Sequence, residues 1–169
     1  MLAVEAAMRA YAGKLDGDVE TWGLVGLLHD LDYERYPDLG SGHPRMALAE
    51  LEKLGFSEEL RRAIASHADF LGVSRDSQME KALFAVDELC GFLMACAYVR
   101  PAGIHGMTPK SVKKKMKTPA FAAAVNREEL REGAEQLGVD FDEHLAFVIA
   151  ALEERSAELA LDGSEPAAR

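Results

Sequence analysis

The sequence predicts an all-α protein, built as a single-domain helical bundle. Hydrophobic residues make up 49% of the chain and aromatic residues only 7%, a composition that favours helices over sheets. Apolar residues recur at helical spacing, and no segment alternates convincingly with the period of two that is typical of a strand. With 169 residues the chain is long enough to bury a sizeable core. We expect one domain over 1–161 and a disordered tail at 162–169.

The first half of the chain predicts four helices separated by breakers. The first ends at Asp16-Gly17-Asp18, which also caps the next helix. A loop over 32–42 follows the second helix, because it contains Pro37, Gly40 and Gly42. The expected helices are 2–14, 18–31, 43–54 and a fourth from the Ser57 cap to near residue 69.

The second half predicts one long helix and several shorter ones. Ser77 and Glu80 form a capping box that opens a helix to about Val99, apolar on nearly all sides and therefore central. Threonine before proline, at 108–109 and again at 118–119, predicts a helix start at each place. Two further caps, Asn126 and Asp140, predict helices to about 137 and about 160.

Charge and hydropathy exclude several classes of protein. A net charge of −10 argues against general nucleic-acid binding, which draws on clustered Lys and Arg. The longest apolar run, Leu89–Val99, is shorter than the roughly 20 residues that cross a membrane. The N-terminus has no basic leader, which argues against a signal peptide. Cys90 and Cys96 suit buried thiols in a reducing compartment, so we expect a soluble, cytoplasmic protein.

Five side chains are candidate metal ligands. His29 and Asp30 end the second helix, where the backbone can turn both toward one ion and the helix dipole favours a cation. His43 follows the glycine-containing loop, His67 falls in the last turn of the fourth helix, and Asp87 lies within the apolar fifth helix. A buried carboxylate in that position needs a cation or strong donors.

The type of ligand narrows the choice of metal. Histidine nitrogens with carboxylate oxygens suit Mn, Fe, Co, Ni or Zn, and carboxylates alone would suit Mg. Each residue taken singly also suits a helix cap, a surface group or half of an ion pair. A purely structural helical protein with incidental histidines is therefore an alternative.

Four segments follow one another along the chain: Gly-Leu-Leu-His-Asp-Leu-Asp-Tyr at 26–33, His43-Pro44, Ile-Ala-Ser-His-Ala-Asp at 64–69 and Ala-Val-Asp-Glu-Leu at 85–89. Taken in this order, they resemble the HD superfamily of metal-dependent phosphohydrolases, most closely its small HDIG-labelled branch. The lysine-rich segment at 110–117 and the segments after it also resemble that branch. The resemblance implies an HD-type helical domain that hydrolyses a phosphomonoester or phosphodiester by a metal-activated water.

The resemblance also implies roles for the five candidates. His29, Asp30 and Asp87 would bind a first divalent ion, and His43 and His67 a second, with Asp30 bridging the two and orienting the attacking hydroxide. One feature departs from the family pattern, since the helix at 2–14 lacks the histidine that members carry there. Either this ligand is absent, or the start of the chain was assigned late.

A basic segment is a candidate for substrate binding. Lys110, Lys113, Lys114 and Lys117 share one face of the predicted helix, and Arg100 is a further candidate. They could attract phosphate to a cleft or simply form a solvated helix face. His105 and His144 are expected to be non-ligands, at the surface or in the core.

The residues and the resemblance together support two functions. The first is a metal-dependent phosphohydrolase acting on a nucleotide or another small phosphate ester. The second is a catalytically weak HD-type module that binds a nucleotide or a partner protein, which the missing histidine favours. The apolar last helix packs inward or onto a second chain, which leaves a homodimer open.

Overall fold

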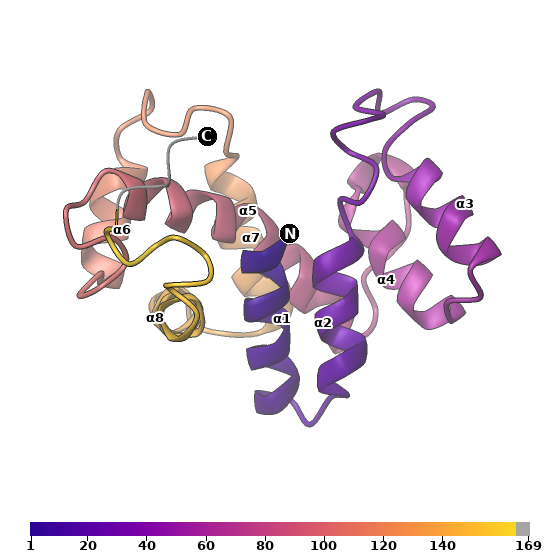
Figure 1. Cartoon of the computed structure of the whole chain (residues 1–169), viewed down its shortest axis with the longest axis horizontal. Helices are drawn as coiled ribbons and strands as arrows, with labels where there is room; N and C mark the ends of the chain where they lie inside the picture. Colours follow the sequence, from indigo (N-terminus) through magenta and orange to yellow (C-terminus); the bar gives the residue numbers. More distant parts are fainter. Residues whose placement is uncertain (165–169) are drawn as a thin grey trace. The chain divides into compact units, whose positions relative to one another are not determined.

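The computed structural model describes residues 1–164 and is helical throughout that part of the chain. It contains eight α-helices, one short 3-10 helix and no strand within these residues (Figure 1), which confirms the expected all-α fold. The chain divides into two compact units, Met1–Phe84 and Ala85–Arg169. A single domain over 1–161 stays a prediction, and residues 165–169 of the expected tail lie outside the described residues.

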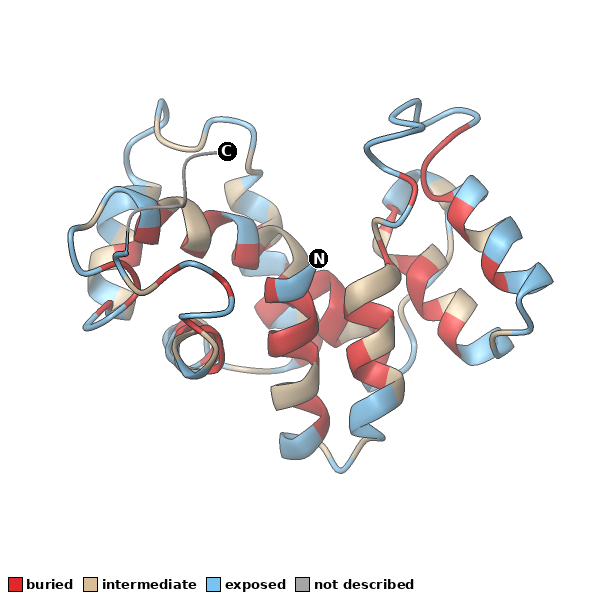
Figure 2. Cartoon of the chain, in the orientation of Figure 1, coloured by how far each residue is buried: buried red, intermediate tan, exposed pale blue. Residues whose placement is uncertain are grey.

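The first unit begins with a helical hairpin. Helices α1 (Leu2–Lys14) and α2 (Val19–Leu28) lie side by side and run in opposite directions (Figure 1). The Asp18 carboxylate accepts the backbone N–H of Thr21 and so caps α2, as the sequence predicted. Both helices carry buried residues (Figure 2), among them Met8, Tyr11 and Val25, which are all 0% exposed.

Gly26 sets how closely the two helices of the hairpin approach. A Cβ atom at this position would lie 2.9 Å from the backbone of Glu5 and of Val4 on α1. That separation is far below an ordinary carbon contact, so a larger residue would push α2 away from α1. The glycine therefore fixes the end of α2, immediately before His29.

The rest of the first unit consists of a second pair of helices and the start of a long one. Helix α3 (Arg45–Lys53) packs on α4 (Glu58–His67), which Ser57 caps and the 3-10 helix η1 (Asp69–Leu71) follows. The expected capping box opens α5 (Gln78–Tyr98), since Ser77 and Glu80 each accept a backbone N–H from the other residue. The Arg62 guanidinium contacts the buried Glu80 carboxylate and ties α4 to this start.

The second unit packs three shorter helices with the remainder of α5. They are α6 (Pro109–Met116), α7 (Arg127–Leu137) and α8 (Phe141–Glu154). Thr108 caps α6 in the expected way and accepts the backbone N–H of Ser111. Neither cysteine forms a disulfide, and both are buried, as expected.

Several helix limits differ from the sequence prediction. No helix starts at 118, and the segment 118–126 consists of turns and irregular residues. Ala122 has a φ of +44°, and the Arg127 guanidinium donates hydrogen bonds to carbonyl oxygens of this segment, so these carbonyls do not enter a helix. Helix α8 ends at Glu154 instead of near 160, and the chain turns back so that Leu161 accepts the backbone N–H of Ile104. The second helix ends three residues earlier than expected, the third begins two residues later, and α4 stops at His67, two residues short of 69.

No helix among the described residues combines the length and the apolar character needed to cross a membrane.

Candidate metal centre

His29 and Asp30 stand where α2 gives way to a loop, as the sequence predicted. The last helical residue is Leu28, and residues 29–35 continue as turns. The His29 side chain is almost fully buried, at 1% exposed, whereas that of Asp30 is 34% exposed. The His29 Nε2 atom and the Asp30 Oδ2 atom lie 3.4 Å apart. The backbone turn thus lets two consecutive residues face the same space.

The loop before His43 folds back so that this residue reaches the same place. The N–H of His43 donates to the carbonyl of Tyr36 at 2.8 Å, and the N–H of Gly42 donates to Asp38 at 2.7 Å. The peptide bond between His43 and Pro44 is cis, and α3 begins at the next residue. His67 arrives from another direction, as the last residue of α4.

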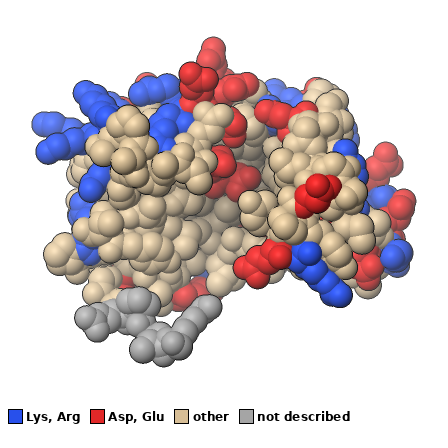
Figure 3. All heavy atoms as spheres, turned by 90° about the horizontal axis from the view of Figure 1, so that it is seen from above, with Lys and Arg blue, Asp and Glu red and all other residues tan. Residues whose placement is uncertain are grey.

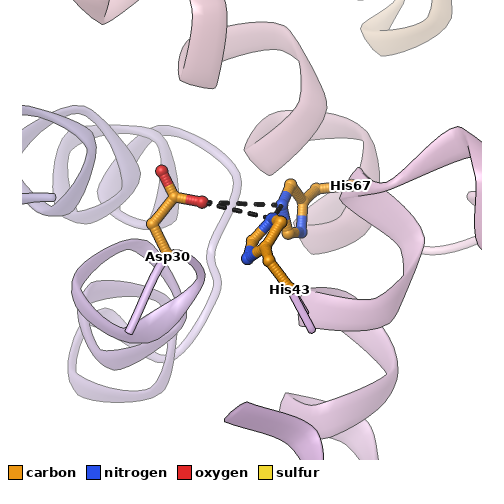
Figure 4. A group of neighbouring side chains, drawn as sticks. All are labelled: Asp30, His43 and His67. Carbon is orange, nitrogen blue, oxygen red and sulfur yellow. Dashed lines mark hydrogen bonds and ion pairs between the residues drawn. The ribbon is translucent and has the colours of Figure 1, made fainter. Parts of the chain in front are cut away.

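Asp30, His43 and His67 converge on one point (Figure 4). The Nε2 atoms of His43 and His67 are 3.2 Å apart. The Asp30 Oδ1 atom lies 3.4 Å from the first of these and 3.9 Å from the second. Two ligand atoms at about 2.1 Å from one transition-metal ion are about 3.0 to 3.4 Å apart for octahedral to tetrahedral angles. Small movements of Asp30 would therefore bring all three within range of a single ion.

The opposite nitrogen of each histidine is engaged by an acceptor. The Nδ1 atom of His29 lies 2.8 Å from the carbonyl oxygen of Gly26, and that of His67 contacts the carbonyl oxygen of Ile64. The Nδ1 atom of His43 lies 2.8 Å from the Asp32 Oδ1 atom. Carbonyls and carboxylates only accept, so Nδ1 carries the proton in all three rings and Nε2 presents a lone pair in the neutral form.

The pair of Nε2 atoms at 3.2 Å is therefore unfavourable without a positive charge. Two neutral rings of this tautomer would direct lone pairs at each other beside the Asp30 carboxylate. A proton on one ring or a shared cation removes the repulsion. The nitrogen and oxygen donors suit a divalent metal. Histidines that bind metals almost always donate their other ring N–H to an acceptor, and the three site histidines do the same.

Asp87 does not belong to the same compact unit. It lies on α5, beyond Phe84 and therefore in the second unit. Its role as a ligand stays a prediction. His105 and His144 occupy the expected kinds of position: His105 is an exposed partner of Glu153, and His144 is buried, with Nε2 3.0 Å from a backbone carbonyl oxygen.

The four predicted substrate-binding lysines lie together along α6 and at the residue that caps its C-terminus, as expected. Lys110, Lys113, Lys114 and Lys117 line one depression of the surface. The Lys113 ammonium group pairs with Asp142 at 2.7 Å. Lys and Arg side chains gather at the left of the space-filling view, on the side where Figure 1 places α6 (Figure 3). Binding of phosphate by this face stays a prediction.

Arg100 has a structural use in the second unit. Its guanidinium donates to the carbonyls of Gly103 and His105 at 2.8 Å each and so closes the turn after α5. A role in substrate binding stays a prediction for this residue.

The sequence did not predict the contacts that two residues near the site, Asp32 and Tyr33, make with His43. Both carboxylate oxygens of Asp32 are used: one on the His43 ring and one on the backbone N–H of Ala47 at 2.7 Å. The half-exposed Tyr33 ring packs edge-on against the His43 ring, with centroids 5.3 Å apart. The sequence gives no periodic signal for either contact, because both residues lie in a loop.

A comparison with protein-family models finds the model described as HD domain over residues 1–90. That match covers just over half of the chain and includes all five predicted metal ligands. No curated protein and no solved structure gives a significant match.

Proposed function

Because the chain belongs to the HD domain family, we propose that it is a metal-dependent phosphohydrolase acting on a small phosphate ester. Membership of the HDIG-labelled branch stays a prediction. The observation that carries the proposal is the convergence of the Asp30 carboxylate with the Nε2 atoms of His43 and His67. All three come from different elements of the first unit, so local packing does not account for their meeting.

The chain's own residues divide the work at this site. His43 and His67 would hold a divalent ion with their Nε2 atoms, and Asp30 would hold it through Oδ1. The second Asp30 oxygen faces His29, which supports the predicted bridging role of this carboxylate between two ions. A bound divalent ion would lower the pKa of a water molecule and polarise a phosphate oxygen. The partly exposed Asp30 side chain is the ligand best placed to orient the attacking group.

The substrate would be anionic and small. The lysine face of α6 supplies cationic charge in a chain of net charge −10, and such a local patch concentrates anions in spite of the overall sign. Tyr33 packs on a ligand histidine with half of its surface exposed. An aromatic ring in that position would contact a flat leaving group, which favours a nucleotide or aryl ester.

Metal analysis and a substrate panel test the proposal. Protein expressed with added Mn, Co or Ni should retain at least one equivalent of metal. It should hydrolyse a member of a panel of nucleotides and nitrophenyl phosphates. The Asp30→Ala variant should lose turnover by at least 100-fold, whereas Glu34→Ala, an exposed acid on the same loop, should keep it. Metal-free wild-type protein, or turnover that survives Asp30→Ala, would refute the proposal.

A second function is favoured by one sequence feature. Helix α1 contains no histidine, whereas the resemblance places a ligand on the helix before the His-Asp pair. A site short of one ligand suits a catalytically weak module that binds a nucleotide or a partner protein. Calorimetry separates the two functions: such a module would bind metal and nucleotide without turning over any ester.

A further inference from the structure

We infer that Asp32 is the positioning residue of the metal centre, because its carboxylate fixes which nitrogen of His43 faces the ion. The inference rests on the proposed function for the presence of an ion, although the state of the His43 ring is a property of the metal-free protein. It adds to the predicted ligand set a residue that touches no ion itself.

The three site histidines are oriented in two different ways. His29 and His67 each stand at the C-terminal end of a helix, and each Nδ1 atom meets the carbonyl oxygen three residues earlier. The last carbonyls of a helix have no intrahelical donor, so the helix itself supplies an acceptor to a histidine at its end. Position in the helix is therefore enough to hold these two rings.

His43 has no such helix behind it. It precedes α3, and its residue lies at the end of a loop. The acceptor for its Nδ1 proton is Asp32, eleven residues earlier, at 2.8 Å. Both side chains are buried, at 5% exposed for Asp32 and 6% for His43. Removal of the carboxylate would leave the His43 ring without the acceptor that keeps Nε2 unprotonated.

The second oxygen of Asp32 holds the carboxylate in place. Its Oδ2 atom accepts the N–H of Ala47, in the first turn of α3, at 2.7 Å. Both oxygens are thus committed, one to a backbone donor that cannot reverse its role and one to His43. The N–H of Ala47 and the Nδ1–H of His43 each need an acceptor. An ionised aspartate offers an acceptor oxygen to both, whereas an asparagine offers one oxygen and one NH₂ donor.

The substitution Asp32→Asn tests the inference with almost no change of shape. The amide oxygen would turn to the N–H of Ala47, so the amide NH₂ group would face Nδ1 of His43. Nδ1 would then accept, and the proton would move to Nε2, the atom that points at His67 and Asp30. A protonated Nε2 cannot bind a metal. Loss of a partner of this kind typically lowers metal affinity 10- to 100-fold.

The control is Asp38→Asn in the same loop. The Asp38 carboxylate also accepts a backbone N–H, that of Ser41 at 2.7 Å, but it contacts no histidine. Any general effect of replacing a loop aspartate by asparagine should therefore appear in both variants. An effect specific to the His43 ring should appear in Asp32→Asn alone.

Two measurements at one fixed pH decide the matter. Long-range ¹H–¹⁵N spectra of the metal-free protein should show a proton on Nδ1 of His43 in the wild type and in Asp38→Asn. The same spectra should show the Nε2–H form in Asp32→Asn. Calorimetric titration with Co²⁺ should give a 10- to 100-fold weaker dissociation constant for Asp32→Asn only.

Each outcome bears on a separate claim. A wild-type His43 ring without a proton on Nδ1 would overturn the inference even if Asp32→Asn failed to fold. An Asp32→Asn variant with wild-type tautomer and Co²⁺ affinity would overturn it as well. A wild-type protein that binds no Co²⁺ but shows the Nδ1–H form would refute the proposed function and leave the role of Asp32 standing.

Discussion

Gly42→Ala tests whether the loop before His43 positions this predicted ligand through a close backbone contact. A Cβ atom at Gly42 would lie 2.3 Å from the carbonyl oxygen of Tyr36 and 2.8 Å from that of Asp38. Ordinary carbon–oxygen contacts are about 3.3 Å or longer, so the loop must shift by roughly 1 Å. The same Tyr36 carbonyl accepts the N–H of His43, and that hydrogen bond would be displaced with it.

The expected cost is about 1–3 kcal/mol of unfolding free energy, as for other overpacked positions. In a chain of this length that lowers Tm by roughly 2–12 °C. The effect on metal binding should be larger, because metal–ligand distances tolerate only about 0.2 Å. We expect Co²⁺ affinity to fall at least 10-fold, measured by calorimetry alongside thermal unfolding of the metal-free protein.

Gly40→Ala in the same loop is the matched control. Its Cβ atom would meet only the Asp38 side chain, at 3.3 Å, so we expect Tm to change little and Co²⁺ affinity to stay within twofold. Equal behaviour of Gly42→Ala and Gly40→Ala in both assays would refute the claim that the Gly42 contact places His43.

Three further predictions concern stability and reactivity. Gly91→Ala should stabilise α5 by about 0.5–1 kcal/mol, since its Cβ atom meets nothing within 4 Å. Gly133→Ala should destabilise the protein, because its Cβ atom would lie 2.6 Å from a backbone atom. Denaturant titration compares the two variants, and a change of the same sign in both would contradict the packing described. Burial raises the pKa of Glu80, but backbone N–H groups and the Arg62 guanidinium outweigh it and hold the pKa below its ordinary value. Glu80→Gln should therefore cost about 1–3 kcal/mol at pH 7. This difference shrinks as the pH falls from the ordinary glutamate pKa of about 4.3 through the lowered pKa of the folded Glu80 carboxylate, and a difference that stays constant from pH 7 to pH 3 would speak against this. Burial raises the pKa of the Cys96 thiol to about 11, so a disulfide reagent at pH 8 should modify it only slowly until denaturant is added, and rapid reaction of the native protein would show the thiol to be accessible.

Local signals account for the parts of the fold that the sequence predicted well. Capping pairs such as Ser77 with Glu80 lie within four residues of each other, so their hydrogen bonds follow from the sequence alone. The Thr118-Pro119 pair shows the limit of such signals. It has the residues of a helix start, but Arg127 draws the following carbonyls into turns. Arg127 lies five and six residues after the carbonyls that it binds, beyond the four-residue window of a cap, so the Thr-Pro pair alone does not show this competition.

The contacts of the candidate site also differ in how far apart in the sequence their partners lie. His29 and His67 were predicted as ligands because each ends a helix, and the contact that orients each ring spans only three residues. The contact between Asp32 and His43 spans eleven residues of loop and chain reversal. No periodicity links two such positions, so the sequence showed both residues but not their pairing.

The histidines outside the site show that orientation distinguishes a ligand better than residue type. The Nε2 atom of the buried His144 lies 3.0 Å from a carbonyl oxygen, so that nitrogen carries a proton and cannot bind a metal. In His29 and His67 the carbonyl meets Nδ1 instead, which leaves Nε2 able to coordinate. A histidine at the C-terminal end of a helix is held in the second way by the helix's own carbonyls. A metal centre assembled from helix ends would therefore need a separate orienting carboxylate only where a ligand comes from a loop, and among the predicted ligands of the first unit that residue is His43.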